Sequence, residues 1–184
     1  MQPTMKSKSS GASTNISISR DDIPLPDQLK MLCAASRPVL LKTIQKLAKQ
    51  NPRELDRIVH SFHLQAFSFY DCLDCANCCR TISPAMSHND VDQLAKKLKI
   101  KPSDLVVKYL QIDDDSDYVF NEAPCPFIGA DNFCSVYSHR PKACREYPHT
   151  DRPRFYQLLK LSLKNAEICP VVYAILMKFL KQDF

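Results

Sequence analysis

The cysteines are the residues of this chain whose type and spacing could do chemistry. Four of the nine lie in the stretch DCLDCANCCR at residues 71–80. Cysteines this close together occur in disulfide frameworks, at redox-active thiols and at sites where thiolates bind metal. These three possibilities make different demands on the compartment and on the rest of the chain.

The composition of the chain disfavours a disulfide framework. Residues 1–19 are rich in Ser, Thr and Lys and lack the run of about seven or more apolar residues that a secretory signal needs. No segment approaches the roughly 20 apolar residues of a membrane span. We therefore expect a cytoplasmic protein with no membrane contact, whose thiols stay reduced, and an odd number of cysteines also fits a paired framework poorly.

The spacing of the clustered cysteines is typical of metal sites. Cys72, Cys75, Cys78 and Cys79 form the pattern CxxCxxCC. Two residues between cysteines allow a tight turn to direct both sulfurs at one ion. The neighbours Cys78 and Cys79 should point apart, which predicts two sets of ligands.

Four cysteines further along the chain could complete these sets: Cys125, Cys134, Cys144 and Cys169. The resulting eight sulfurs fit two four-thiolate centres, or one such centre and four remaining thiols. Four thiolates around one Zn²⁺ carry a net negative charge, which the neighbouring Arg80, Arg140, Lys142 and Arg145 could offset. The ninth cysteine, Cys33, stands far upstream on an apolar segment, and we expect it to be an ordinary buried side chain.

The identity of the metal stays open between zinc and iron. The Cys-Pro pairs at Cys125 and Cys169 resemble the remote ligand of bacterial ferredoxins, but zinc accepts the same thiolates. His139 and His149 could replace a thiolate, although an ordinary polar role is favoured for both. A nucleophilic Cys144 is the main enzymatic alternative, yet metal ligation explains its basic neighbours more simply.

The apolar spacing predicts a mainly α-helical fold. Helices are expected over 38–50, 51–69, 87–98 and 102–110, around Leu158–Leu163, and from Pro170 to Leu180. Tyr118–Phe120 and Phe133–Tyr137 are short and aromatic, and with the turn residues 129–132 between them they predict a small β-hairpin. The Asp-rich residues 113–117 predict a solvated loop.

The chain is long enough for one compact domain. We expect a disordered tail over 1–19, a helical N-terminal part over 20–69 and a cysteine-cluster metal-binding region over 70–184, which forms one globular unit with 35–69. The net charge of +5 is only mildly basic and forms no dense stripe interleaved with aromatic residues, which disfavours nucleic-acid binding. With only two glycines, the chain has no glycine-rich phosphate loop, which excludes the usual nucleotide-binding and dinucleotide-binding enzymes.

Together, DCLDCANCCR, CPF, CSVY and RPKACREYP resemble the CxxCxxCC cysteine-cluster family, also called the YkgJ family. The resemblance covers about residues 70–170 and implies a zinc- or iron-chelating domain in which the eight cysteines bind the metal, with a 4Fe-4S cluster as one of its forms. A flagellin lysine methylase has a similar cysteine pattern associated with an iron-sulfur cluster. The expected function is therefore metal binding, and the alternative is an iron-sulfur redox protein or an accessory subunit of a modifying enzyme such as a protein methylase. The sequence does not decide whether the protein is itself an enzyme, and it names no protein partner.

Overall fold

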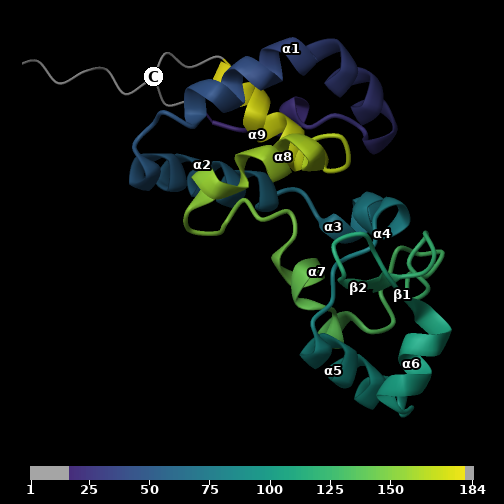
Figure 1. Cartoon of the computed structure of the whole chain (residues 1–184). Helices are drawn as coiled ribbons and strands as arrows, with labels where there is room; N and C mark the ends of the chain where they lie inside the picture. Colours follow the sequence, from purple (N-terminus) through teal and green to yellow (C-terminus); the bar gives the residue numbers. More distant parts are fainter. Residues whose placement is uncertain (1–16, 181–184) are drawn as a thin grey trace, which may run out of the picture.

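The computed structural model describes residues 17–180, and this part of the chain is mainly helical (Figure 1). The α-helices are α1 (Leu29–Leu47), α2 (Pro52–Phe67), α3 (Cys72–Cys75), α4 (Asn77–Thr81), α5 (His88–Leu98), α6 (Pro102–Tyr109), α7 (Lys142–Glu146), α8 (Leu159–Asn165) and α9 (Pro170–Leu180). Short 3-10 turns cover Arg20–Asp22, Pro26–Gln28, Tyr137–His139 and Phe155–Leu158. Strands β1 (Leu110–Ile112) and β2 (Tyr118–Phe120) form one antiparallel hairpin. The expected fold class, a mainly α domain with one small hairpin, is confirmed.

Two of the helices begin at side-chain caps that the sequence predicts. The Asn51 side chain accepts the backbone N–H groups of Arg53 and Glu54 at 3.0 and 3.3 Å, where α2 begins. Ser87 and Asp90 form a capping box at the start of α5. Such caps satisfy backbone donors that have no partner within the helix, so these two helix starts are fixed locally.

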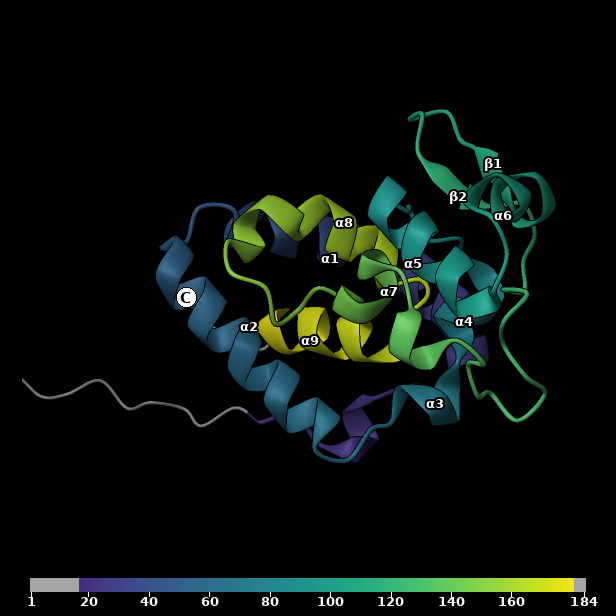
Figure 2. The ribbon, with the colours of Figure 1, turned by 90° about the horizontal axis from the view of Figure 1, so that it is seen from below.

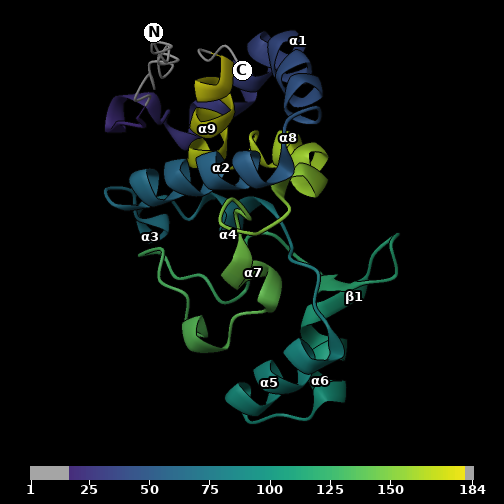
Figure 3. The same cartoon turned by 90° about the vertical axis from the view of Figure 1, so that its left-hand side faces the viewer.

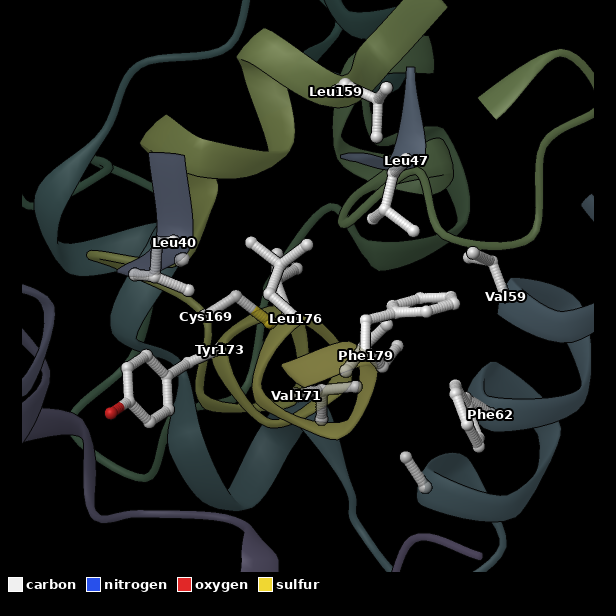
Figure 4. Packing of buried hydrophobic residues seen from close by; sticks show 14 of the residues in the cluster. Leu40, Leu47, Val59, Phe62, Leu159, Cys169, Val171, Tyr173, Leu176 and Phe179 are labelled. Atoms are coloured by element: carbon white, nitrogen blue, oxygen red, sulfur yellow. The ribbon is translucent and has the colours of Figure 1, made fainter. Parts of the chain in front are cut away.

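Helices α1, α2, α8 and α9 pack around one hydrophobic cluster (Figures 2 and 4). Helix α9 is apolar around most of its circumference, and its Leu176 and Phe179 are at most 2% exposed. The Phe179 ring meets Phe62 of α2 edge to face, with centroids 5.6 Å apart. Each fully buried Leu or Phe contributes about 1.5–3 kcal/mol relative to an exposed one. This large cluster comprises Ile18, Leu29, Cys33, Leu40, Leu47, Leu55, Val59, Phe62, Ala66, Phe155, Leu159, Ala166, Cys169, Val171, Val172, Tyr173, Ile175, Leu176 and Phe179.

A second, smaller cluster lies under α5, α6 and the hairpin. The Phe127 ring packs against Phe120 of β2, with centroids 5.6 Å apart, and against Tyr109 at 5.2 Å. The small cluster comprises Met86, Val91, Leu94, Ala95, Leu105, Leu110, Phe120, Phe127 and Val136. Figures 1 and 3 show α3, α4 and α7 between the helices of the large cluster and the pair α5 and α6. The cysteine-bearing segments therefore lie where the two hydrophobic clusters meet.

The start of α1 was predicted wrongly. We expected a helix from residue 38, because proline usually opens a helix. Instead α1 begins at Leu29 and contains Pro38 in its interior. Proline removes one backbone hydrogen bond there, but Leu29, Cys33 and Leu40 continue one buried stripe across it. Tertiary burial thus outweighs the local cost of the proline.

The pairing of the hairpin was also predicted wrongly. Strand β2 pairs with Leu110–Ile112 rather than with residues 133–137. The loop between the strands is the Asp-rich segment, in which the Asp113 side chain accepts the backbone N–H groups of Asp115 and Asp117 at 3.0 and 2.9 Å. Residues 129–132 do turn the chain, but only the isolated bridge between Ile128 and Cys134 flanks them. The aspartates close the hairpin because their side chains bond their own backbone.

The predicted tail over 1–19 lies only in part within the described residues. Residues 1–16 lie outside them, and Ile18 packs into the large cluster and donates its N–H to the Gln65 side chain at 2.9 Å.

Among the helices of residues 17–180, none combines the length and the apolar character that crossing a membrane requires.

Asp90 links α5 to the segment that carries Cys144. One carboxylate oxygen accepts the Ser87 N–H and hydroxyl, and the other accepts the Lys142 N–H at the start of α7, at 2.9 Å. Burial alone would raise the pKa of Asp90, but the hydrogen bonds from Ser87 and Lys142 outweigh it and hold the pKa below its usual value. The carboxylate is therefore a stabilising tether between α5 and α7.

We expect Asp90→Ala to lower the free energy of unfolding by about 1–3 kcal/mol at neutral pH, because a helix cap and a charge-assisted bond are lost. Since the pKa of Asp90 is lowered in the folded state, this contribution is present above the unfolded pKa of about 3.9 and is lost as the pH falls through the folded pKa. Urea unfolding at several pH values measures it. Asp92→Ala, at an exposed position of the same helix, should stay within about 0.5 kcal/mol of the wild type. Equal effects of the two substitutions would rule out the tether.

Candidate metal centre

The eight predicted cysteines lie on six separate segments of the fold. Cys72 and Cys75 lie in α3, Cys78 and Cys79 in α4, Cys125 in the loop after β2, Cys134 after the turn 129–132, Cys144 in α7 and Cys169 directly before α9. All nine cysteines of the chain are free. Cys169 is buried, Cys72 is exposed and the other six are half-buried. The site is therefore assembled from distant parts of the sequence.

A left-handed residue between α3 and α4 redirects the chain within the CxxCxxCC motif. Ala76 has φ 47° and ψ 13° and is only 3% exposed. A non-glycine residue in this region costs roughly 1–2 kcal/mol. The Asp71 side chain caps α3 by accepting the Leu73 N–H at 2.8 Å. Because α3 ends at this bend, the pairs Cys72/Cys75 and Cys78/Cys79 belong to two short helices rather than to one continuous one.

One group of sulfurs lies against the large cluster. We call Cys72, Cys75, Cys78 and Cys169 the first thiol set. The pKa of Cys169 is raised to about 12, mainly by burial and also by the charges of Cys72 and Cys75. The backbone N–H groups of Val171 and Val172, at the start of α9, donate to the Cys169 sulfur and act in the opposite direction.

Cys78 belongs with the same group. Its pKa is raised by the hydrogen bond it donates to Cys79, by burial and by the charges of Cys169 and Cys72. The Asn77 side chain donates to the Ile168 carbonyl at 2.7 Å. This bond holds α4 against the residue that precedes Cys169.

The remaining sulfurs lie toward the small cluster. We call Cys79, Cys125, Cys134 and Cys144 the second thiol set. The Cys125 N–H donates to the Cys79 carbonyl at 2.8 Å. Burial, followed by the charges of Cys79, Cys125 and Cys134, raises the pKa of Cys144 to about 12. Cys125 and Cys134 also pack against the small cluster.

Two of the four predicted basic residues act directly on the thiols. The pKa of Cys79 is lowered to about 7, first because Cys78 donates a hydrogen bond to it and then because Arg140 and Arg80 favour its thiolate. The Arg140 guanidinium lies 3.5 Å from the centroid of the Tyr137 ring, and Arg80 donates to the Asn132 side chain at 2.6 Å. Both arginines are thus held by neutral groups and keep their charge available to the sulfurs.

The other two basic residues point elsewhere. Lys142 lies 3.7 Å from the Glu146 carboxylate, on the same face of α7. Arg145 donates to the Arg140 carbonyl, which fixes the loop before α7. Their role at the site is therefore indirect.

Two tyrosines line the first thiol set. Tyr147, which the sequence placed near the motif, has a buried hydroxyl with no hydrogen-bond partner among the described residues. Burial and the charges of Cys169 and Cys78 raise its pKa. Tyr70 donates its hydroxyl to Cys75, and burial together with this bond raises its pKa as well. Sequence reasoning missed Tyr70, although its position two residues before Cys72 was a usable signal.

His139 and Cys33 make ordinary contacts, whereas His149 has a buried Nδ1 with no hydrogen-bond partner among the described residues. His139 shares a hydrogen bond of 2.8 Å with the neighbouring Ser138. Burial lowers the pKa of His149, a direction that also favours the neutral ring. Cys33 is 5% exposed within the large cluster and donates to the Ala166 carbonyl at 3.2 Å. The expectation that Cys33 is a small buried side chain is confirmed.

The donor set fits a thiophilic metal. Free thiols are soft ligands that bind zinc and iron-sulfur clusters and do not suit hard cations such as Mg²⁺ or Ca²⁺. In residues 17–180, no three His, Cys, Asp or Glu side chains converge closely enough, as they stand, to hold one ion. Ligation at about 2.3 Å would therefore require the cysteine side chains to turn inward from their present neighbourhood.

The same segments match a known family. Residues 71–170, which are more than half of the chain, match the model of the CxxCxxCC family, described as "Putative zinc- or iron-chelating domain". The matched region contains all eight cysteines of the two thiol sets. No curated protein and no solved structure matched the chain. The gathering of eight free thiols and the match over the whole segment that carries them lead to one conclusion: the chain belongs to the CxxCxxCC family.

Proposed function

We propose that this protein binds zinc or iron through the eight cysteines of the two thiol sets, and that the metal joins the large cluster to the small one. The observation that carries the proposal is the meeting of free thiols from six segments between two hydrophobic clusters. Membership of a family described as zinc- or iron-chelating supports the same chemistry.

The electrostatics of the region disfavours Cys144, the candidate nucleophile of the enzymatic alternative; among the shifted cysteines only Cys79, whose pKa is lowered to about 7, favours a thiolate. A reactive cysteine needs a stable thiolate, yet burial raises the pKa of Cys72 and Cys125 to about 11 and of Cys144 and Cys169 to about 12. Cys144, which was the candidate nucleophile, is therefore a poor one. A bound cation would reverse these effects because it favours every thiolate it contacts.

Backbone donors are available to the sulfurs. Cys125 accepts from the N–H groups of Phe127 and Ile128, and Cys134 accepts from Val136. Such bonds stabilise thiolates in structural zinc sites and tune the potential of iron-sulfur clusters. These hydrogen bonds are compatible with either metal. The alternative function, an iron-sulfur redox protein or an accessory subunit of a modifying enzyme, is therefore distinguished from zinc binding by analysing the metal in the isolated protein. We further propose a reducing compartment, the cytoplasm, because eight free thiols persist only there.

Purification without oxygen should yield protein with metal bound at a fixed ratio to the chain. Elemental analysis measures zinc and iron directly, and a brown colour that bleaches with dithionite identifies an iron-sulfur cluster. Colourless protein with stoichiometric zinc identifies the zinc form. Protein that carries neither metal, even after reconstitution of the reduced thiols with zinc or with iron and sulfide, would refute metal binding.

Serine at one position of each thiol set should reduce metal content and stability. Cys75→Ser and Cys144→Ser each remove one ligand, so part of the bound metal should be lost. Because metal binding contributes to folding, a metal present at 100 times its dissociation constant adds about 2.7 kcal/mol, and loss of one site should lower the melting temperature by several degrees.

The ninth cysteine provides the matched control. Cys33→Ala removes a buried thiol that belongs to neither set. It should cost about 1 kcal/mol of stability through lost packing and leave metal content unchanged. Calorimetry with and without a chelator checks both effects. Wild-type metal content in Cys75→Ser and Cys144→Ser, or loss of metal in Cys33→Ala, would contradict the assignment.

A further inference from the structure

We infer that the eight cysteines form two separate four-thiol centres, one made of Cys72, Cys75, Cys78 and Cys169 and the other of Cys79, Cys125, Cys134 and Cys144. This assignment rests on the proposed metal binding, and it adds how many centres there are and which cysteines share each one.

The division begins inside α4. Cys78 and Cys79 are neighbours on this short helix, and neighbouring helical side chains do not face the same point. The segments that approach them differ. The Cys79 carbonyl receives the N–H of Cys125, whereas Asn77, one residue before Cys78, is bonded to Ile168. Cys79 and the residue before Cys78 are therefore hydrogen-bonded to different parts of the chain.

The first centre belongs to the large cluster. Cys169 is itself a member of that cluster, and Tyr70 and Tyr147 pack against it. Both tyrosines interact with Cys72, Cys75 and Cys169. The two cysteines of α3 and the cysteine directly before α9 thus interact with the same two tyrosines.

Cys78 completes the first centre. It interacts with Cys169, Cys72 and Tyr147, all of which lie on the side of the large cluster. Its contact with Cys79 marks the boundary between the centres, and Cys72 also lies within the electrostatic reach of Cys79. The two centres are therefore adjacent, with the boundary running through α4.

The second centre belongs to the small cluster. Cys125 and Cys134 pack against it, and Asp90 ties the helix that carries Cys144 to α5 of the same cluster. Cys144 interacts with Cys79, Cys125 and Cys134. These four sulfurs come from four segments that are all connected to the small cluster or to one another by backbone bonds.

The surroundings of the two centres differ in part. Arg80 and Arg140 both favour the Cys79 thiolate, and Arg140 also favours the thiolates of Cys134 and Cys144 and, in the first set, of Cys72. The hydroxyls of Tyr70 and Tyr147 lie on the side of the first centre. Each centre would fasten one hydrophobic cluster to α4, which carries one ligand of each.

Adjacent serine substitutions test the division, with zinc as the probe. The full-length protein, Cys78→Ser and Cys79→Ser are each reconstituted with zinc without oxygen, and bound zinc per chain is measured. Each sample is then treated with iodoacetamide, and the alkylated cysteines are identified by peptide mass spectrometry. Cys33 serves as an internal reporter, because it becomes reactive only when the large cluster opens.

The wild type should hold two zinc ions and protect all eight thiols. Cys78→Ser should hold one zinc, expose Cys72 and Cys75 to alkylation, and keep the second thiol set protected; Cys169 is buried in the same cluster as Cys33 and does not serve as a reporter. Cys79→Ser should give the mirror pattern, with Cys125, Cys134 and Cys144 exposed. Protected Cys33 in both variants would show that the loss is local.

Other patterns would overturn the division. One zinc in the wild type, or thiols of both sets exposed in Cys78→Ser while Cys33 stays protected, excludes two independent centres. If a variant exposes Cys33, the wild-type species with one zinc, isolated as an intact ion after alkylation and fragmented, decides instead: its labels must all fall on one thiol set, and labels on both sets contradict the inference. A wild type that binds no zinc or iron at all would refute the proposed function itself, whereas two zinc ions with mixed protection would refute only the division.

Discussion

The crowding of eight ionisable sulfurs in a half-buried space is the constraint on which the rest of the structure depends. Burial and mutual repulsion oppose thiolates, and they raise the pKa of Cys144 and Cys169 to about 12. Only Cys79, with a hydrogen bond from Cys78 and two arginines nearby, is shifted in the opposite direction. A bound cation would stabilise such an arrangement, because it favours the thiolates that burial and mutual repulsion oppose.

The fold places this constraint at the junction of two hydrophobic clusters. Helix α9 supplies the large cluster with fully buried side chains and begins directly after Cys169, so the packing of the helix also positions that sulfur. On the other side, Asp90 joins α5 to α7 and fixes the segment of Cys144. Bonds between Cys125 and Cys79 and between Asn77 and Ile168 bring the remaining segments to α4.

Much of this could be predicted from the sequence where the signal is local. The caps at Asn51 and Ser87 fixed the starts of two helices, and the spacing of the cysteines predicted a thiol-rich site. The expectation that Cys78 and Cys79 point apart was not met in full, because the Cys78 thiol donates a hydrogen bond to Cys79. Two predictions from the sequence were wrong. Pro38 lies inside α1 because a buried stripe continues across it, and β2 pairs with residues 110–112 because aspartate side chains close that loop. The left-handed Ala76 could not be foreseen, since nothing in its residue type signals that conformation, whereas the position of Tyr70 two residues before Cys72 was a signal that the sequence interpretation missed.

The central claim is that cysteine sulfurs alone surround the metal. X-ray absorption spectroscopy at the edge of the bound metal, recorded on protein purified without oxygen, measures the first coordination shell most directly. The account predicts a shell of sulfur only, at about 2.3 Å, four atoms per metal ion, with no nitrogen or oxygen neighbour. A shell dominated by nitrogen or oxygen would contradict it, because the two sets of thiols would then not be the ligands.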